Sequence, residues 1–146
     1  MKQYLLLILA FLICPALFGQ VSSEYCEEKF SDWNDDINYF ILYESIPELK
    51  GGIESLFPYL NYPESAIESG IEGVVTIWFL VNEDGKPVCK RVIQSVDKDI
   101  DEVAVNAVRK SEFVPATIKD EPVSRAMTLP FTFSLDERKA RPGKLD

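Results

Sequence analysis

The fold of this chain is decided by residues 73–94, which read GVVTIWFLV-NEDGK-PVCKRVIQ in one-letter code. The first part is rich in β-branched and aromatic residues, and this composition predicts a strand over residues 72–81. Residues 82–86 are typical of a hairpin turn in which Gly85 supplies a positive φ angle. We expect the return strand over residues 88–95, so the whole segment forms an antiparallel β-hairpin.

The first strand of this hairpin is apolar on both of its faces. Val75, Ile77 and Phe79 point to one side, whereas Val74, Trp78 and Leu80 point to the other. A strand of this kind lies inside a sheet that is covered on both faces. Helices can cover one face, and the aromatic N-terminal segment or a second subunit must cover the other.

A second strand is predicted near the end of the chain, over residues 124–135. Its odd positions are all apolar, and they are Met127, Leu129, Phe131, Phe133 and Leu135. Its even positions are small or polar, and they are Ala126, Thr128, Pro130, Thr132 and Ser134. This alternation with a period of two predicts a strand with one buried face.

Between these strands, residues 99–112 carry the clearest helical pattern. Its apolar residues recur at helical spacing and form one stripe: Ile100, Val103, Ala104, Ala107 and Val108. We expect Asp99 to cap the N-terminus, with Glu102 as its reciprocal partner. Shorter helices are expected over residues 53–60 and from Pro63 to Gly70, and residues 119–122 are expected to form a turn.

These elements predict an α+β fold in which two to three helices pack on a small antiparallel sheet, in the order helix, β-hairpin, helix, edge strand. The folded domain is expected over residues 51–135. An acidic and aromatic segment, residues 21–50, precedes it, and it contains a short amphipathic helix around Phe30 and Trp33. Residues 136–146 are predicted to be a loose charged tail.

Residues 1–20 resemble an export signal, since Lys2 precedes an uncharged apolar run that Pro15 interrupts. A membrane span needs about 20 apolar residues, so we expect cleavage and a periplasmic or exported protein. The alternative is that residues 4–19 remain as an inner-membrane anchor.

The composition argues against several classes of function. The chain of 146 residues contains no histidine, which removes the commonest general base and the usual zinc ligand. Its net charge of −9 disfavours binding to nucleic acid. With no phosphate-binding glycine loop and no clustered metal ligands, we expect no catalytic residues, no metal, no cofactor and no small-molecule substrate. The chain is therefore not expected to be an enzyme.

Two cysteines, Cys26 and Cys89, follow the export signal. In an oxidising compartment they can form a disulfide that ties the N-terminal segment to the sheet. The alternative is a pair of unpaired thiols, because the spacing of two cysteines does not establish that they are close in space.

Five signals occur in the order found in one known family, and they are Tyr62-Pro63-Glu64-Ser65-Ala66, the strand from Gly73, the Asp84-Gly85 turn, Phe113-Val114-Pro115-Ala116, and Leu129-Pro130-Phe131-Thr132-Phe133. This order resembles the C-terminal domain of the TonB family, whose members grip outer-membrane transporters. The stretch 49–52 before Tyr62 further resembles stand-alone, exported TonB-like proteins of the Bacteroidetes type. The chain lacks the long Pro-rich spacer of energy-transducing members.

The resemblance implies a binding module that captures an extended segment of an envelope or outer-membrane transport protein by β-strand addition. In this family the last strand takes the partner's peptide, and a region matching Tyr62 and Pro63 touches the transporter. Tyr62 can equally be a core-facing residue that packs before its helix.

Pro130 supports an open edge independently of the resemblance, because proline cannot donate to a ladder and belongs on edge strands. The predicted partner-binding residues are Tyr62, Pro63, Ala126, Thr128, Pro130, Thr132 and Ser134. Alternatively, Pro130 lies at a bulge and the last strand only closes the sheet. A further alternative for the protein is a structural envelope domain that forms a homodimer.

Overall fold

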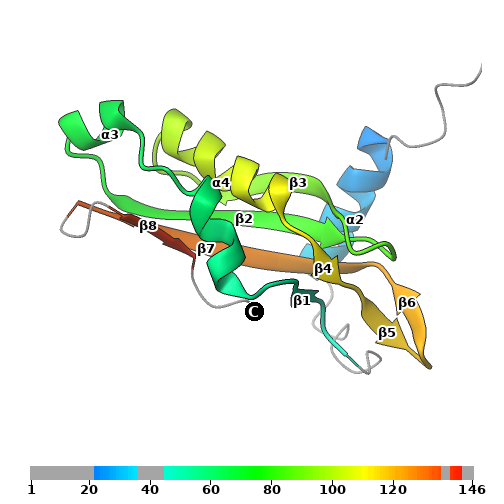
Figure 1. The fold of residues 1–146 in the computed structure, drawn as a ribbon. Helices are drawn as coiled ribbons and strands as arrows, with labels where there is room; N and C mark the ends of the chain where they lie inside the picture. Colours follow the sequence, from blue (N-terminus) through cyan, green and yellow to red (C-terminus); the bar gives the residue numbers. More distant parts are fainter. Residues whose placement is uncertain (1–21, 36–44, 136–138, 143–146) are drawn as a thin grey trace, which may run out of the picture.

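The computed structural model describes residues 22–35, 45–135 and 139–142. The helices are α2 (Ser23–Asp35), the 3-10 helix η2 (Ile53–Tyr59), α3 (Glu64–Glu68) and α4 (Lys98–Lys110). The strands are β1 (Glu48–Leu49), β2 (Gly73–Val81), β3 (Pro87–Gln94), β4 (Phe113–Val114), β5 (Ala116–Ile118), β6 (Glu121–Val123), β7 (Arg125–Ser134) and β8 (Lys139–Pro142). This is the predicted α+β architecture, with helices packed on small antiparallel sheets (Figure 1).

The central sheet has four antiparallel strands in the order β3-β2-β7-β8. β2 pairs with β7 in an unbroken register from Gly73 opposite Phe133 to Val81 opposite Arg125. The hairpin turn between β2 and β3 forms as predicted, with Gly85 at φ 74°. Two short antiparallel pairs, β1 with β4 and β5 with β6, lie outside this sheet.

One face of the sheet, which we call the inner face, carries the hydrophobic core. It receives the odd-numbered residues of β2 and β7, among them Phe79 and Phe131, both fully buried. The apolar stripe of α4 packs against them, and Ile100, Ala104, Ala107 and Val108 are buried. The alternation in β7 and the periodicity of α4 therefore place side chains as predicted.

The opposite face, which we call the outer face, is covered by α2 (Figure 1). Trp78 on this face is fully buried and contacts Phe30 and Trp33 of α2, with ring centroids 5.0 and 6.2 Å away. The sequence allowed either the N-terminal segment or a second subunit to cover this face. In the structure the N-terminal segment, through α2, covers it. The predicted export signal, residues 1–20, lies outside the described residues.

The start of α4 differs from the prediction. The residue that caps the helix is Asp97, whose carboxylate accepts a hydrogen bond from the Asp99 backbone N–H at 3.0 Å. Asp97 has extended backbone angles, φ −152° and ψ 151°, as a capping residue requires. Asp99 is already inside the first turn, where its carboxylate accepts from Ser65 Oγ. Pro63 likewise precedes α3 as its capping residue.

The charged tail was expected to be loose, and this is wrong for residues 139–142. They form β8 and pair with β7, from Phe131 opposite Pro142 to Ser134 opposite Lys139. The exposed edge of β7 explains the difference, because its unpaired backbone groups accept a strand without regard to the strand's side chains.

Candidate functional site

The two sides of β7 are occupied to different extents. On one side β2 pairs with all nine positions from Arg125 to Phe133. On the other side β8 pairs only with residues 131–134. Within the ranges that the structure describes, no strand pairs with Ala126–Pro130 on this second side. We refer to this segment as the β7 edge.

The prediction that the edge is bare along the whole strand is therefore wrong at its C-terminal half. Thr132 lies opposite Arg141, and Ser134 lies opposite Lys139. These two of the predicted partner-binding residues are engaged by the chain itself. Ala126, Thr128 and Pro130 lie in the stretch that β8 leaves uncovered.

The side chains of the even-numbered β7 residues lie on the outer face. Thr128 is the register partner of Trp78, and Ala126 is the partner of Leu80. Because directly opposed residues of an antiparallel pair share a face, these side chains lie beside the surface that α2 covers. Ala126, Thr128 and Pro130 are each half-buried.

Pro130 lies opposite Thr76 of β2. Proline has no N–H, and successive residues of a strand direct their backbone groups to alternate sides. The pairing with β2 is unbroken, and it loses no hydrogen bond at Pro130 if the backbone groups of that residue face away from β2. On this argument the N–H and C=O groups of Ala126 and Thr128 also face the uncovered side.

Tyr62 lies on the inner face, where it packs within the molecule. Its ring meets Phe133 edge-on at a centroid distance of 5.4 Å, and its hydroxyl donates a hydrogen bond to the Ile71 carbonyl. Burial, and secondly the nearby Glu72 carboxylate, raise the pKa of the Tyr62 hydroxyl. These contacts correspond to the packing role that the sequence also allowed for Tyr62.

Pro63, in contrast, lines an open pocket of about 390 Å³. Tyr59 and Asn61 line it beside Pro63, and the first turns of α4 contribute Asp99 and Glu102. Tyr62 and Pro63 thus lie on the α4 side of the sheet, away from the even-numbered side chains of β7. The structure does not bring the two groups of predicted site residues together.

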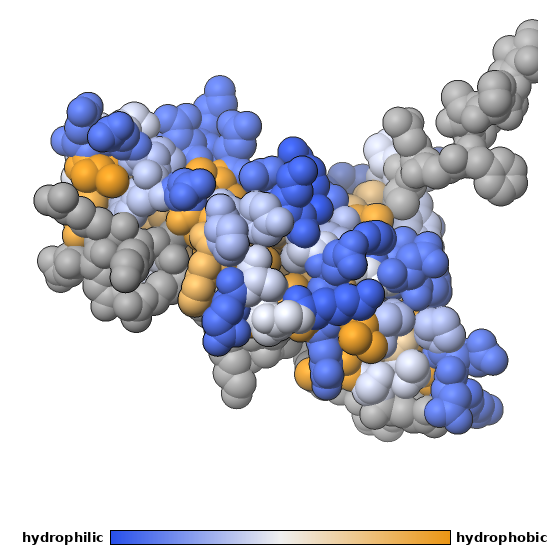
Figure 2. Space-filling view, in the orientation of Figure 1, coloured by the Kyte–Doolittle hydropathy of each residue, from blue (hydrophilic) through white to orange (hydrophobic). Residues whose placement is uncertain are grey.

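Figure 2 shows the surface of one side of the molecule, on which apolar residues appear in separate small patches among hydrophilic ones. Exposed large apolar residues include Phe57 and Tyr59 of η2 and Val114 of β4. Among the described residues visible on this side, no broad apolar patch is present.

Glu72 holds the C-terminal end of β7, a role that the sequence pattern did not reveal. Its carboxylate accepts hydrogen bonds from the Leu135 backbone N–H and from Ser134 Oγ. The sequence did place Glu72 just before β2. Antiparallel pairing brings the start of β2 to the end of β7, so this position could have indicated the contact.

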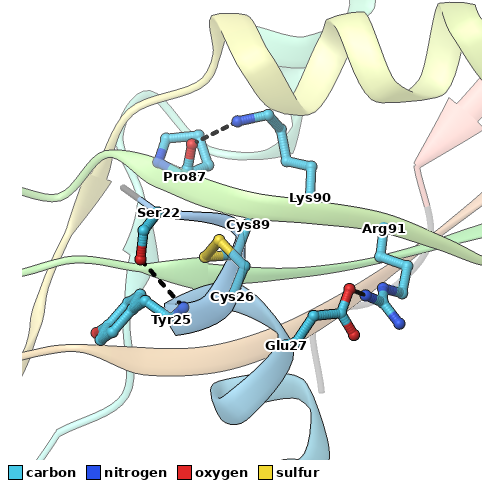
Figure 3. The surroundings of a disulfide bond; sticks show 8 residues. All are labelled: Ser22, Tyr25, Cys26, Glu27, Pro87, Cys89, Lys90 and Arg91. Carbon is cyan, nitrogen blue, oxygen red and sulfur yellow. Dashed lines mark hydrogen bonds and ion pairs between the residues drawn. A yellow bond between two sulfur atoms is a disulfide. The ribbon is translucent and has the colours of Figure 1, made fainter. Parts of the chain in front are cut away.

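The structure joins Cys26 of α2 to Cys89 of β3 in a disulfide, with their Cα atoms 5.1 Å apart (Figure 3). Within the described ranges, no group of three or more acidic or cysteine side chains is arranged to hold a metal ion. None of the helices in that part of the chain has the length and apolar character needed to cross a membrane.

Comparison with curated proteins finds no match. The family model of the Gram-negative bacterial TonB protein C-terminal domain matches residues 58–135, which is more than half of the chain. The match runs from η2 to the end of β7 and so includes both the β7 edge and Pro63. Domains of this family are envelope-associated modules for protein interaction, and their partners include outer-membrane transporters. The chain belongs to the TonB C-terminal domain family.

Proposed function

We propose that this protein captures an extended segment of an envelope or outer-membrane transport protein, which pairs as an added strand with the β7 edge. The observation that carries the proposal is the uneven pairing of β7, complete on the β2 side and limited to residues 131–134 on the β8 side. Unpaired backbone groups on such an edge provide affinity, and alternate side chains provide specificity.

The opposite edge of the sheet, β3, is less suited to strand addition. Its pairing with β2 shifts register between Thr76 and Ile77 and again between Trp78 and Leu80. Irregularities of this kind twist an edge away from regular pairing, and charged residues such as Lys90 and Arg91 oppose it further. This contrast favours β7 as the receiving strand.

β8 supports the proposal in a second way, because it is itself a short strand added to the same side of β7. A guest segment of up to about five residues can pair with Ala126–Pro130 while β8 stays in place. A longer guest has to displace β8 before it reaches Thr132 and Ser134. Pro63 would contribute a separate contact on the α4 side through the pocket that it lines, whereas Tyr62 packs within the molecule.

The proposal is tested with a synthetic peptide copying the extended N-terminal segment of an outer-membrane transporter, titrated into the isotope-labelled chain. We expect the largest amide chemical-shift changes at residues 126–130. Changes confined to other regions, for example to the pocket beside Pro63, would show that the edge is not the binding site.

Two substitutions at Thr128 separate main-chain from side-chain recognition. Thr128→Pro removes one N–H at a position with the same orientation as Pro130, and we expect affinity to fall about three- to tenfold because one hydrogen bond to the guest is lost. Thr128→Val keeps the N–H and is expected to bind within about twofold of the natural chain. Equal losses in both variants would contradict main-chain pairing.

The alternative function, self-association, is favoured by the same uncovered edge, since two copies can pair edge to edge. Light scattering at increasing concentration distinguishes the two functions. A dimer that persists in the presence of the peptide would support a structural domain without transporter coupling.

We also propose that the protein is exported to the periplasm and that residues 1–20 are removed. Sequencing the N-terminus of the protein purified from its native envelope tests this proposal. A mature N-terminus near Gln20 or Val21 is expected, whereas retention of residues 4–19 would favour an anchored form.

A further inference from the structure

The helix α2 is held on the outer face of the sheet by a small set of side chains. Cys26 is bonded to Cys89, and Glu27 forms an ion pair with Arg91 (Figure 3). The guanidinium of Arg91 also lies 4.1 Å from the centre of the Phe30 ring. Among the described residues, no backbone hydrogen bond connects α2 to the sheet. The cover is therefore joined to the sheet through its side chains and one covalent bond.

Trp78, the residue beneath α2, lacks one hydrogen bond. Trp78 is completely buried, and its indole Nε1 has no hydrogen-bond partner among the described residues. An indole N–H that is buried without an acceptor loses the hydrogen bond that water would provide. This loss opposes the packing of Phe30 and Trp33 against Trp78, so it weakens the noncovalent hold on α2.

Cys89 occupies an unusual position in β3. Two residues, Cys89 and Lys90, lie between the pairs Trp78–Arg91 and Leu80–Val88, where β2 has the single residue Phe79. At this bulge Cys89 has φ 53°, a left-handed conformation that is costly for a residue with a side chain.

Val88 and Arg91, on either side of the bulge, pair with the outer-face residues Leu80 and Trp78, and the extra residue allows Cys89 to face outward as well. Figure 3 shows Cys89 facing α2, whereas Lys90 faces α4 on the other side. Burial and the nearby Arg109 lower the pKa of the Lys90 ammonium group, in agreement with this inward position. A strained backbone at this residue is explained by the need to aim its sulfur at Cys26.

The two cysteine residues are less buried than the tryptophan beneath α2. Cys26 and Cys89 are each partly exposed, while Trp78 is not exposed at all. Exchange begins when a thiolate reaches one of the two sulfur atoms, and at these partly exposed residues we expect this step to need no prior opening of the sheet.

We propose that the Cys26–Cys89 disulfide is a redox-sensitive latch, which a dithiol reductant opens to release α2 and expose Trp78. One thiolate of the reductant attacks one sulfur and forms a mixed disulfide, and the other cysteine leaves as a thiolate that takes a proton from water. The second thiol of the reductant, as a thiolate, then attacks the reductant sulfur of the mixed disulfide, and the remaining cysteine leaves as a thiolate and is protonated. Two electrons pass to the cysteines, and the dithiol becomes a disulfide.

The experiment uses the chain with Trp33→Phe, so that Trp78 is the sole tryptophan reporter, and dithiothreitol as the dithiol. We expect reduction to shift tryptophan emission to longer wavelength and to increase acrylamide quenching severalfold. Alkylation followed by mass spectrometry confirms that Cys26 and Cys89 are both reduced. Hydrogen exchange at β2 and β7 should remain slow, since the inner-face core is untouched.

Two variants in the same background provide controls. Cys26→Ser should show the exposed signal with and without dithiothreitol, whereas Glu27→Gln removes only the ion pair and should retain a shielded, reductant-sensitive Trp78. Three results would overturn the latch: Trp78 shielded in the fully reduced chain, a disulfide that resists the reductant until the domain unfolds, or simultaneous loss of exchange protection across β2 and β7.

Discussion

The carbonyl oxygen of Phe113 lies directly against Gly85, at a point 2.0 Å from where a β-carbon on Gly85 would stand. The Phe113 backbone N–H also donates a hydrogen bond to the Gly85 carbonyl at 2.9 Å. The turn between β2 and β3 is thereby bonded to the start of β4, at the end of α4. Gly85 serves both the turn, through its φ of 74°, and this close approach.

We therefore predict that Gly85→Ala lowers the free energy of unfolding by about 3 kcal/mol or more, because the methyl group displaces the Phe113 backbone. Gly70→Ala is the matched control. Gly70 has a similar φ of 66°, but no atom lies within 4 Å of the point that a β-carbon there would occupy. It should lose only about 1 kcal/mol, the cost of the left-handed backbone. Urea unfolding measures both, and equal losses would contradict the steric explanation.

Tyr62→Phe should lower the free energy of unfolding by about 1 kcal/mol at pH 7, since the hydroxyl no longer donates to the Ile71 carbonyl. The pKa of Tyr62 is raised above its ordinary value of 10.0, mainly by burial. The folded state thus favours the neutral hydroxyl, and this stabilisation is complete below pH 10.0 and is lost as pH rises through the folded-state pKa.

The difference in stability between the natural chain and Tyr62→Phe should consequently shrink above pH 10.0. Urea unfolding of both proteins at neutral and alkaline pH provides the measurement. A difference that stays constant across this range would show that Tyr62 does not titrate differently in the folded state.

Asp97→Ala should cost about 1 kcal/mol of stability, because the capping hydrogen bond to the Asp99 N–H disappears. Asp99→Ala is the comparison, since alanine removes the carboxylate that the sequence pattern alone suggested as the cap, whereas asparagine would itself cap a helix. It should cost only about 0.5 kcal/mol, from the lost interaction with the helix dipole and the exposed contact with Ser65. A larger effect at Asp99 than at Asp97 in thermal or urea unfolding would contradict the assigned start of α4.

A chain that ends at Leu135 lacks β8 and leaves β7 uncovered through Ser134. If the proposed guest strand extends past Pro130, it competes with β8. Displacing β8 from β7 should cost about 1 kcal/mol, so truncation should increase peptide affinity about fivefold. Calorimetric titration of the full and truncated chains measures this change. Unchanged affinity would restrict the guest to residues 126–130.

Much of the fold could be predicted because its patterns are local. The stripe from Ile100 to Val108 is periodic, and it specifies both the helix and the face that packs on the sheet. The alternation from Met127 to Phe133 likewise specifies the buried side of β7. In both cases neighbours in sequence carry the information, and the hydrophobic effect alone selects the orientation.

The candidate site could be predicted only in part. Pro130 suggested an edge strand, because the lost donor is a property of that residue alone. In the structure β7 lies between β2 and β8, and Ala126–Pro130 has no strand paired on its second side among the described residues. The extent of the open edge depends on β8, whose residues 139–142 have no alternating apolar pattern and join the sheet through backbone groups. The capping role of Asp97 rather than Asp99 depends in the same way on local backbone angles.

By itself, the sequence determined the hairpin of β2 and β3, the long helix α4, the buried face of β7 and the family of the chain. Each of these rests on side-chain order within a short window. Only the tertiary structure decided that α2 covers Trp78, that a bulge aims Cys89 at Cys26, and that β8 leaves Ala126–Pro130 uncovered. These features join residues distant in the chain through backbone groups or single contacts, and such contacts leave no periodic signal in the sequence.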